Sequence, residues 1–172
     1  MSSASGNPVK VLLIEDNPLH VGLVKTLLAE SKSPVFQLQF AGTLQEGLNQ
    51  LKDTAIDIVL LDLTLPDSED LDTFIRVRSF APSIPIVIVT SMDDIKLAAK
   101  AVEAGAQDYL LKSQLSRSSL IRSLRYAIER TKVRDAEWDS PMFRLAQRQF
   151  LKAAQFMGLD DNIRQRLLFP QR

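Results

Sequence analysis

Short apolar runs alternate with helical patterns along most of the chain. The runs Val9–Ile14, Asp57–Leu63 and Pro85–Thr90 are rich in Val, Ile and Leu, which predicts strands buried on both faces of a sheet. Val35–Phe40 and Asp108–Leu111 carry weaker versions of the same pattern and predict two further strands. We therefore expect five strands.

Each predicted strand is followed by a segment with helical periodicity. Gly105 is expected to end the fourth helix, and Pro141 disfavours helical conformation at Ser140. The predicted helices are Leu19–Glu30, Leu44–Leu51, Asp70–Phe80, Asp93–Ala104 and a last helix from the N-cap Ser116 to about Asp139. Because parallel strands need crossover connections, five such units predict an α/β fold, a doubly wound parallel sheet with helices on both faces. A length of about 120 residues fits the smaller doubly wound type.

The composition is that of an ordinary globular protein of 172 residues, of which 45% are hydrophobic and 24% charged. The 21 basic residues balance the 21 acidic ones overall, but their distribution is uneven. Residues 1–130 hold 13 basic and 16 acidic side chains, a net charge of −3, and residues 131–172 hold 8 and 5, a net charge of +3. The acidic first part argues against nucleic-acid binding, and the scattered charges of the tail favour a solvated helix face.

The sequence also limits the cellular environment. It contains no cysteine, which excludes disulfides and thiolate metal sites and fits a reducing compartment. Its apolar stretches, such as Val11–Ile14 and Ile58–Leu61, are far shorter than the roughly 20 residues of a membrane span. Residues 1–8 have neither the basic start nor the apolar core of a secretory signal, and we expect a disordered lead. We therefore expect a cytoplasmic protein without membrane contact.

Polar residues stand at the ends of four predicted strands, where ligands bind in open parallel sheets. Three carboxylates, two hydroxyls and one lysine meet there: Glu15, Asp16, Asp62, Thr90, Ser91 and Lys112. Hard oxygen ligands suit Mg²⁺, and the lysine and a hydroxyl can neutralise the oxygens of a phosphoryl group. Asp62 would then be the nucleophile and form an aspartyl phosphate. Each residue alone is more often a cap or turn residue, but their joint occurrence at four strand ends favours the functional interpretation.

Four segments that carry these residues closely resemble the receiver domain of bacterial two-component response regulators. They are Val11–Pro18, Ile58–Asp67, Pro85–Ser91 and Gly105–Lys112. The resemblance covers about residues 9–130 and implies a five-stranded sheet in the order 2-1-3-4-5. We therefore expect a lead at 1–8, a receiver domain at 9–130 and a helical C-terminal extension at 131–172.

The resemblance implies a role for each residue at the strand ends. Asp62 matches the phospho-acceptor, Glu15 and Asp16 match the acidic metal-binding pair, and the backbone carbonyl of Thr64 matches a further protein ligand of Mg²⁺.

Three later residues match the parts that contact the phosphoryl group and respond to it. Thr90 and Lys112 match the hydroxyl and the lysine that contact the phosphoryl group, and Tyr109 matches the switch aromatic that turns inward when Thr90 moves. The chain departs from the family at Ser113, where most receivers have a proline after a cis peptide bond. A non-proline cis bond costs about 2.5–4 kcal/mol, so we expect a trans bond or a locally different loop.

The remaining features leave alternatives open. His20, the only histidine, could accept phosphate, but a lone histidine on a helix is more often a surface or packing residue. The tail has one apolar helix face, which predicts either a hairpin that folds back or a docking segment: Phe143, Ala146, Phe150, Ala153 and Met157. Residues 147–172 also resemble the N-terminal helices of glutamate dehydrogenase-type enzymes. This second resemblance includes no catalytic position of the enzyme. It opens the alternative that the chain is a fragment or relic of a receiver–enzyme fusion.

Together these features predict a Mg²⁺-dependent response regulator receiver. It accepts a phosphoryl group on Asp62 from a sensor histidine kinase or phosphotransfer protein and slowly hydrolyses it. It signals to a downstream protein, or to a second copy in a homodimer, through its fourth helix, fifth strand, fifth helix and tail. One alternative is a haloacid-dehalogenase-type phosphatase, although Thr64 stands where that class has its acid. A phosphorylation-independent scaffold is the other alternative.

Overall fold

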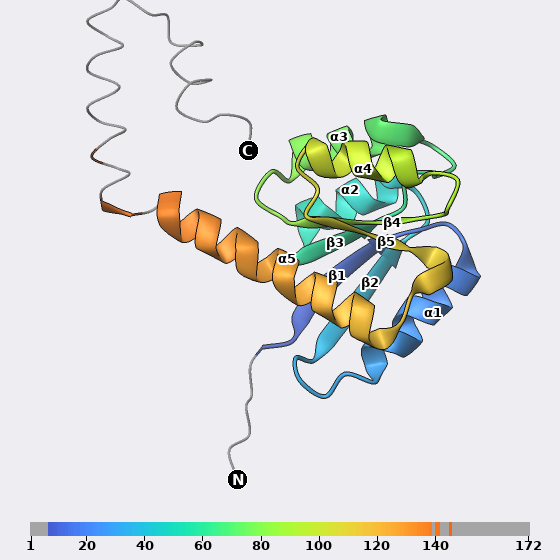
Figure 1. The fold of residues 1–172 in the computed structure, drawn as a ribbon, viewed down its shortest axis with the longest axis horizontal. Coiled ribbons are helices and arrows are strands. Elements are labelled where there is room, and N and C mark those ends of the chain that lie inside the picture. The colour runs from blue at the N-terminus through green and yellow to red at the C-terminus, as the bar shows by residue number, and fades with distance from the viewer. Residues whose placement is uncertain (1–6, 139, 142–144, 146–172) are drawn as a thin grey trace, which may run out of the picture. The chain divides into compact units, whose positions relative to one another are not determined.

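The computed structural model describes residues 7–138, 140, 141 and 145. The five strands are β1 Val9–Ile14, β2 Phe36–Ala41, β3 Ile58–Leu61, β4 Ile86–Thr90 and β5 Asp108–Leu111. The helices are α1 Pro18–Ala29, α2 Leu44–Asp53, α3 Asp70–Phe80, α4 Ile95–Glu103 and α5 Arg117–Trp138, with a short 3₁₀ turn, η1 Lys112–Gln114. Strands and helices alternate as the sequence predicts (Figure 1).

The sheet is parallel throughout, in the order β2-β1-β3-β4-β5. This confirms both the fold class and the strand order. Alternate residues of the strands feed two separate apolar clusters. One cluster packs under α2, α3 and α4, and the other packs under α1 and α5.

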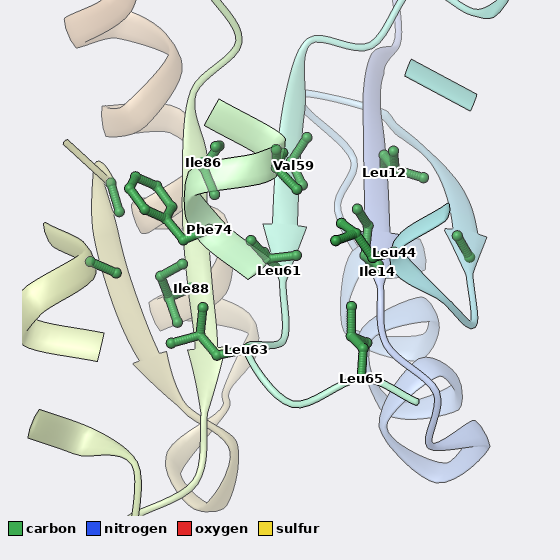
Figure 2. Packing of buried hydrophobic residues seen from close by; sticks show 14 of the residues in the cluster. Leu12, Ile14, Leu44, Val59, Leu61, Leu63, Leu65, Phe74, Ile86 and Ile88 are labelled. Carbon is green, nitrogen blue, oxygen red and sulfur yellow. The ribbon is translucent and has the colours of Figure 1, made fainter. Parts of the chain in front are cut away.

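The cluster under α2, α3 and α4 extends beyond the strands into the loop after β3. Leu12, Ile14 and Leu61 come from the strands, and Leu63 and Leu65 come from that loop (Figure 2). β3 is therefore shorter than the predicted Asp57–Leu63, because the chain leaves the sheet at Asp62 while its leucines remain in the core. The loop that carries Asp62 is consequently anchored by apolar burial.

Local sequence signals set the ends of two of the helices. The Asn17 side chain accepts a hydrogen bond from Leu19 N at 2.9 Å and caps α1, whose first residue is a proline. Gly105, at φ +113°, follows the end of α4 in a backbone conformation that favours glycine, as predicted. Among the described residues the only cis peptide bond is Ser33–Pro34, so Lys112–Ser113 is trans and leads into η1.

The chain divides into two units after Ile128, within α5. The first unit holds the whole sheet. Residues 1–6 of the predicted lead at 1–8 lie outside the described residues, and so does the apolar tail face. None of the helices that the structure describes has the length and apolar character of a membrane span.

Candidate functional site

The predicted residues meet at the carboxyl edge of the sheet. Glu15 and Asp16 directly follow β1, Asp62 follows β3 and Lys112 follows β5. Together with Thr64 they line one pocket of about 290 Å³. The parallel strands end at the same edge of the sheet, which brings these residues together although Glu15 and Lys112 are far apart in the chain.

Lys112 joins two buried carboxylates at the centre of this pocket. Its Nζ lies 2.6 Å from Asp62 Oδ2 and 2.8 Å from Glu15 Oε2. The Glu15 side chain is 1% exposed, and its other oxygen, Oε1, accepts a hydrogen bond from Asn17 N at 3.0 Å. The second oxygen of Asp62, Oδ1, accepts from Thr64 N at 3.1 Å. Both carboxylates are therefore held in fixed orientations.

Burial and hydrogen bonds together shift the pKa values of Asp62 and Lys112. Desolvation raises the pKa of Asp62 above its ordinary value, although the hydrogen bonds from Lys112 and Thr64 N pull it down. Desolvation would lower the pKa of Lys112, but its hydrogen bonds to Asp62 and Glu15 outweigh that effect and raise the pKa. Lys112 is thus a firmly protonated partner for a carboxylate that would otherwise resist ionisation.

The residues present suit a divalent cation. Ligand atoms of Glu15, Asp16 and Asp62 lie within 4.8 Å of one another. With Asp94, four carboxyl groups and one lysine line the pocket, so acidic side chains outnumber the basic one. Oxygen ligands with room for water are what Mg²⁺ requires. The acidic cluster is therefore of the type that binds Mg²⁺.

The two predicted switch residues lie outside this pocket. Thr90 is 1% exposed, and its hydroxyl donates to Ser91 O at 3.4 Å. Tyr109 is half-buried and packs against the cluster under α2, α3 and α4. The side chains of β4 and β5 that were predicted to respond to phosphate therefore do not line this pocket.

Three pocket residues were not assigned to the site from the sequence. Asn17, the N-cap of α1, lines the pocket, and so does Asp94, which accepts a hydrogen bond from Ser91 Oγ at 2.8 Å. His20 lies in the first turn of α1, with Nδ1 3.4 Å from Glu15 Oε2, so it is part of the pocket wall and not simply a surface residue. Its position one helical turn after the acidic pair is the signal that could have located it.

Comparison with known proteins settles the family. Residues 11–125 match the profile of the response regulator receiver domain. The chain belongs to this family. Receivers of two-component systems signal through a phospho-accepting aspartate and act with histidine kinases, so this chain is a phospho-acceptor and not a classical enzyme. The phosphatase alternative is thereby not supported.

Individual relatives agree with this assignment. The chain is 28% identical over 108 residues to the transcriptional regulatory protein ZraR of Klebsiella oxytoca. The aligned region covers 63% of this chain and 24% of the relative. It is 35% identical over 104 residues to the swarming motility regulation protein RssB of Serratia marcescens, covering 60% and 46%. The chain therefore spans about a quarter to a half of the length of these relatives. A crystal structure of a response regulator receiver domain protein from Clostridium thermocellum matches with a TM-score of 0.65 at 26% identity, covering 73% of this chain and 98% of that one.

Proposed function

We propose that Asp62 is the residue that accepts the phosphoryl group. The observation that carries this assignment is the contact of its Oδ2 with Lys112 Nζ at 2.6 Å, inside a pocket lined by three further carboxylates. Lys112 Nζ and Thr64 N each hold one of the two oxygens of Asp62.

Residues in and near the pocket would each have a separate role in the phosphoryl transfer. A carboxylate oxygen of Asp62 forms the new bond to phosphorus while the bond from phosphorus to the donor imidazole nitrogen breaks, and the imidazole takes up a proton. Lys112 balances the charge of the transferred oxygens. The hydroxyl of Thr90 would turn from Ser91 O toward the phosphoryl group. Tyr109 would then fill the vacated space.

Glu15, Asp16, Asp62 and the backbone carbonyl of Thr64 would hold Mg²⁺ in this proposal. The bound ion would neutralise charge on the phosphoryl oxygens during transfer. Glu15 and Asp16 orient the site from β1, and Asp62 and Thr64 do so from the loop after β3. These four residues follow two neighbouring strands, β1 and β3, so a single ion could engage them together.

The phosphoryl donor would be a sensor histidine kinase or a phosphotransfer protein in the cytoplasm. Output would pass through protein contacts of α4, β5, α5 and the extension at 131–172 to a downstream protein or a second copy of the chain. We propose a receiver domain at 9–130 and no nucleic-acid or membrane partner.

Intact mass spectrometry after incubation with Mg²⁺ and acetyl phosphate tests the acceptor. The native chain should gain the mass of one phosphoryl group, and Asp62→Asn should gain none because the amide is not a nucleophile here. Asp53→Asn, at the exposed end of α2, is the matched control and should be modified like the native chain. A full adduct on Asp62→Asn would assign the acceptor to another residue.

A further inference from the structure

The loop between β3 and α3 is tied to both neighbouring helices by side chains that do not line the pocket. Asp67 lies at its exposed side, and its carboxylate accepts two backbone hydrogen bonds from the start of α2. Oδ1 accepts from Leu44 N at 2.8 Å, and Oδ2 accepts from Gln45 N at 2.9 Å. These bonds outweigh desolvation and lower the pKa of Asp67, so it remains a carboxylate at neutral pH.

Thr73 ties the other side of the loop to α3. It is fully buried, and its hydroxyl lies 3.1 Å from Leu63 O and 2.9 Å from Ser68 Oγ. Since the Thr73 hydroxyl donates to the Leu63 carbonyl, it can accept from the Ser68 hydroxyl. One buried side chain therefore connects the residue just before Thr64 with a residue four positions after it.

The backbone between these two ties is also paired. Leu65 N donates to Ser68 O at 2.8 Å. The Leu65 N–H and the Thr64 carbonyl belong to one planar peptide unit and point in opposite directions. Holding the N–H toward Ser68 consequently fixes the direction of the Thr64 carbonyl, the group expected to bind Mg²⁺.

Apolar contacts anchor the same stretch on either side of Thr64. Leu63 is 1% exposed and Leu65 is 7% exposed. Figure 2 shows their side chains on either side of the end of β3. Burial of the two leucines holds the loop down, but it leaves the rotation of the peptide unit between them to the polar ties. The hydrogen bonds of Asp67 and Thr73 therefore have a separate task from the leucines.

We propose that Asp67 and Thr73 are positioning residues that set the affinity of the site for Mg²⁺ by fixing the direction of the Thr64 carbonyl. This inference rests on the proposed function. Asp67 holds the loop against α2, and Thr73 holds Ser68, the residue that binds the Leu65 N–H. Neither residue is among those that line the pocket. Residues that orient a ligand without touching the metal can change metal affinity by about 10–100-fold.

The alternative is that both residues only stabilise the fold, Asp67 as a cap of α2 and Thr73 as a buried hydrogen-bond partner. The two roles differ in what they change. A purely structural role lowers the free energy of unfolding and leaves the Mg²⁺ affinity of the folded chain unaltered. A positioning role weakens Mg²⁺ binding in chains that are still folded.

Calorimetric titration with Mg²⁺ in the absence of any phosphoryl donor is the test. Thr73→Val keeps the shape but removes the hydroxyl, and Asp67→Asn keeps the shape but replaces one acceptor oxygen with a donor group. We expect the dissociation constant of Mg²⁺ to rise about tenfold in each. Thr73→Ser, which restores a hydroxyl, should recover most of the affinity. Circular dichroism at the titration temperature shows that each variant is folded.

Two control variants remove comparable bonds elsewhere. The exposed Asp57 accepts a hydrogen bond from Lys10 N at 2.8 Å, at the opposite edge of the sheet. The Thr54 hydroxyl donates to Gln50 O at 2.6 Å at the end of α2. Asp57→Asn and Thr54→Val should therefore bind Mg²⁺ like the native chain.

Each outcome decides a separate point. Native affinity in both Thr73→Val and Asp67→Asn overturns the inference, while the adduct on Asp62 would still support the proposed function. A loss in only one variant retains the role for that residue and overturns it for the other. If Thr73→Val does not fold, Asp67→Asn provides the test, because Asp67 is exposed and its replacement leaves the core intact. Absence of Mg²⁺ binding in the native chain would overturn both the inference and the metal assignment.

Discussion

Lys112 holds together a pocket that is otherwise dominated by negative charge. Among the described residues that line the pocket, Glu15, Asp16, Asp62 and Asp94 are acidic and Lys112 alone carries a permanent positive charge. Without a bound cation, its ammonium group is what offsets the cost of burying Asp62 beside Glu15. The residue is therefore expected to stabilise the folded chain as well as to contact the phosphoryl group.

Replacing Lys112 with Met tests this at the residue scale. In a buffer with a chelator at pH 7, we expect the free energy of unfolding to fall by about 2–4 kcal/mol, because two buried carboxylates lose their partner. The pKa of Asp62 is already raised by burial and should rise further in the variant. A carboxyl with a raised pKa stabilises the fold when protonated and loses that contribution as pH rises, so the deficit should grow between about pH 4 and pH 7.

Urea denaturation of the native and variant chains at several pH values measures this deficit. Lys100→Met, at an exposed position of α4, is the control and should show a small difference at every pH. A deficit in Lys112→Met that does not change with pH would mean that Lys112 contributes through packing rather than through charge.

At the scale of elements, the approach of α2 to β1 depends on a single glycine. A Cβ atom at Gly47 would lie 2.4 Å from Ile14 Cδ1 and 2.9 Å from its Cγ1. Ile14 is fully buried and directly precedes Glu15, so it has little freedom to move away. The absence of a side chain at residue 47 thus allows α2 to pack on the strand that carries the acidic pair.

We expect Gly47→Ala to lower the free energy of unfolding by about 1–2 kcal/mol, because overpacking of up to about 3 kcal/mol outweighs the gain of about 1 kcal/mol in helix propensity. Gly22→Ala in α1 is the matched control, since a Cβ there would meet nothing within 4 Å. That variant should be stabilised by about 0.5–1 kcal/mol. Thermal or urea unfolding compares the two, and a stabilised Gly47→Ala would contradict the packing argument.

At the scale of the whole molecule, the acceptor site is connected to α5 through β5. Asp108, at the start of β5, accepts a hydrogen bond from Ser123 Oγ of α5 at 2.7 Å. Lys112, at the other end of the strand, contacts Asp62. Movement of Lys112 or Tyr109 on phosphorylation would therefore be transmitted to the helix that leads into the C-terminal extension.

Addition of Mg²⁺ and beryllofluoride should change amide hydrogen exchange in β5 and α5, while the distant edge strand β2 serves as the internal control. We also expect a change in self-association or partner docking through residues 117–157. Light scattering measures the self-association. We expect no change in any catalytic output. Unchanged exchange in β5 and α5, together with an unchanged mass, would mean that the last helix and tail are structural only. Asp62→Asn should show no response in either measurement.

The sequence by itself determined the elements and the fold class, and it predicted most of the residues that gather in the candidate site. Buried strands and amphipathic helices have local periodicities, and the order of strands and helices restricts the topology. Residues at strand ends must then meet at one edge, which is why Glu15, Asp16, Asp62 and Lys112 were predictable together. The individual roles of these residues, and of Thr64, Thr90 and Tyr109, stay predictions until the variants are measured.

Only the tertiary structure decided the contacts between residues that no local pattern relates. The Lys112–Asp62 contact joins residues 50 positions apart, and Asp67 reaches α2 across 22 and 23 positions. The third predicted helix does begin at Asp70, but no sequence signal indicated that the φ of this residue, 62°, lies in the region that favours glycine. Such details follow from how the packed elements approach one another, because the same side chain can cap a helix, line a pocket or orient a loop depending on what the fold brings next to it.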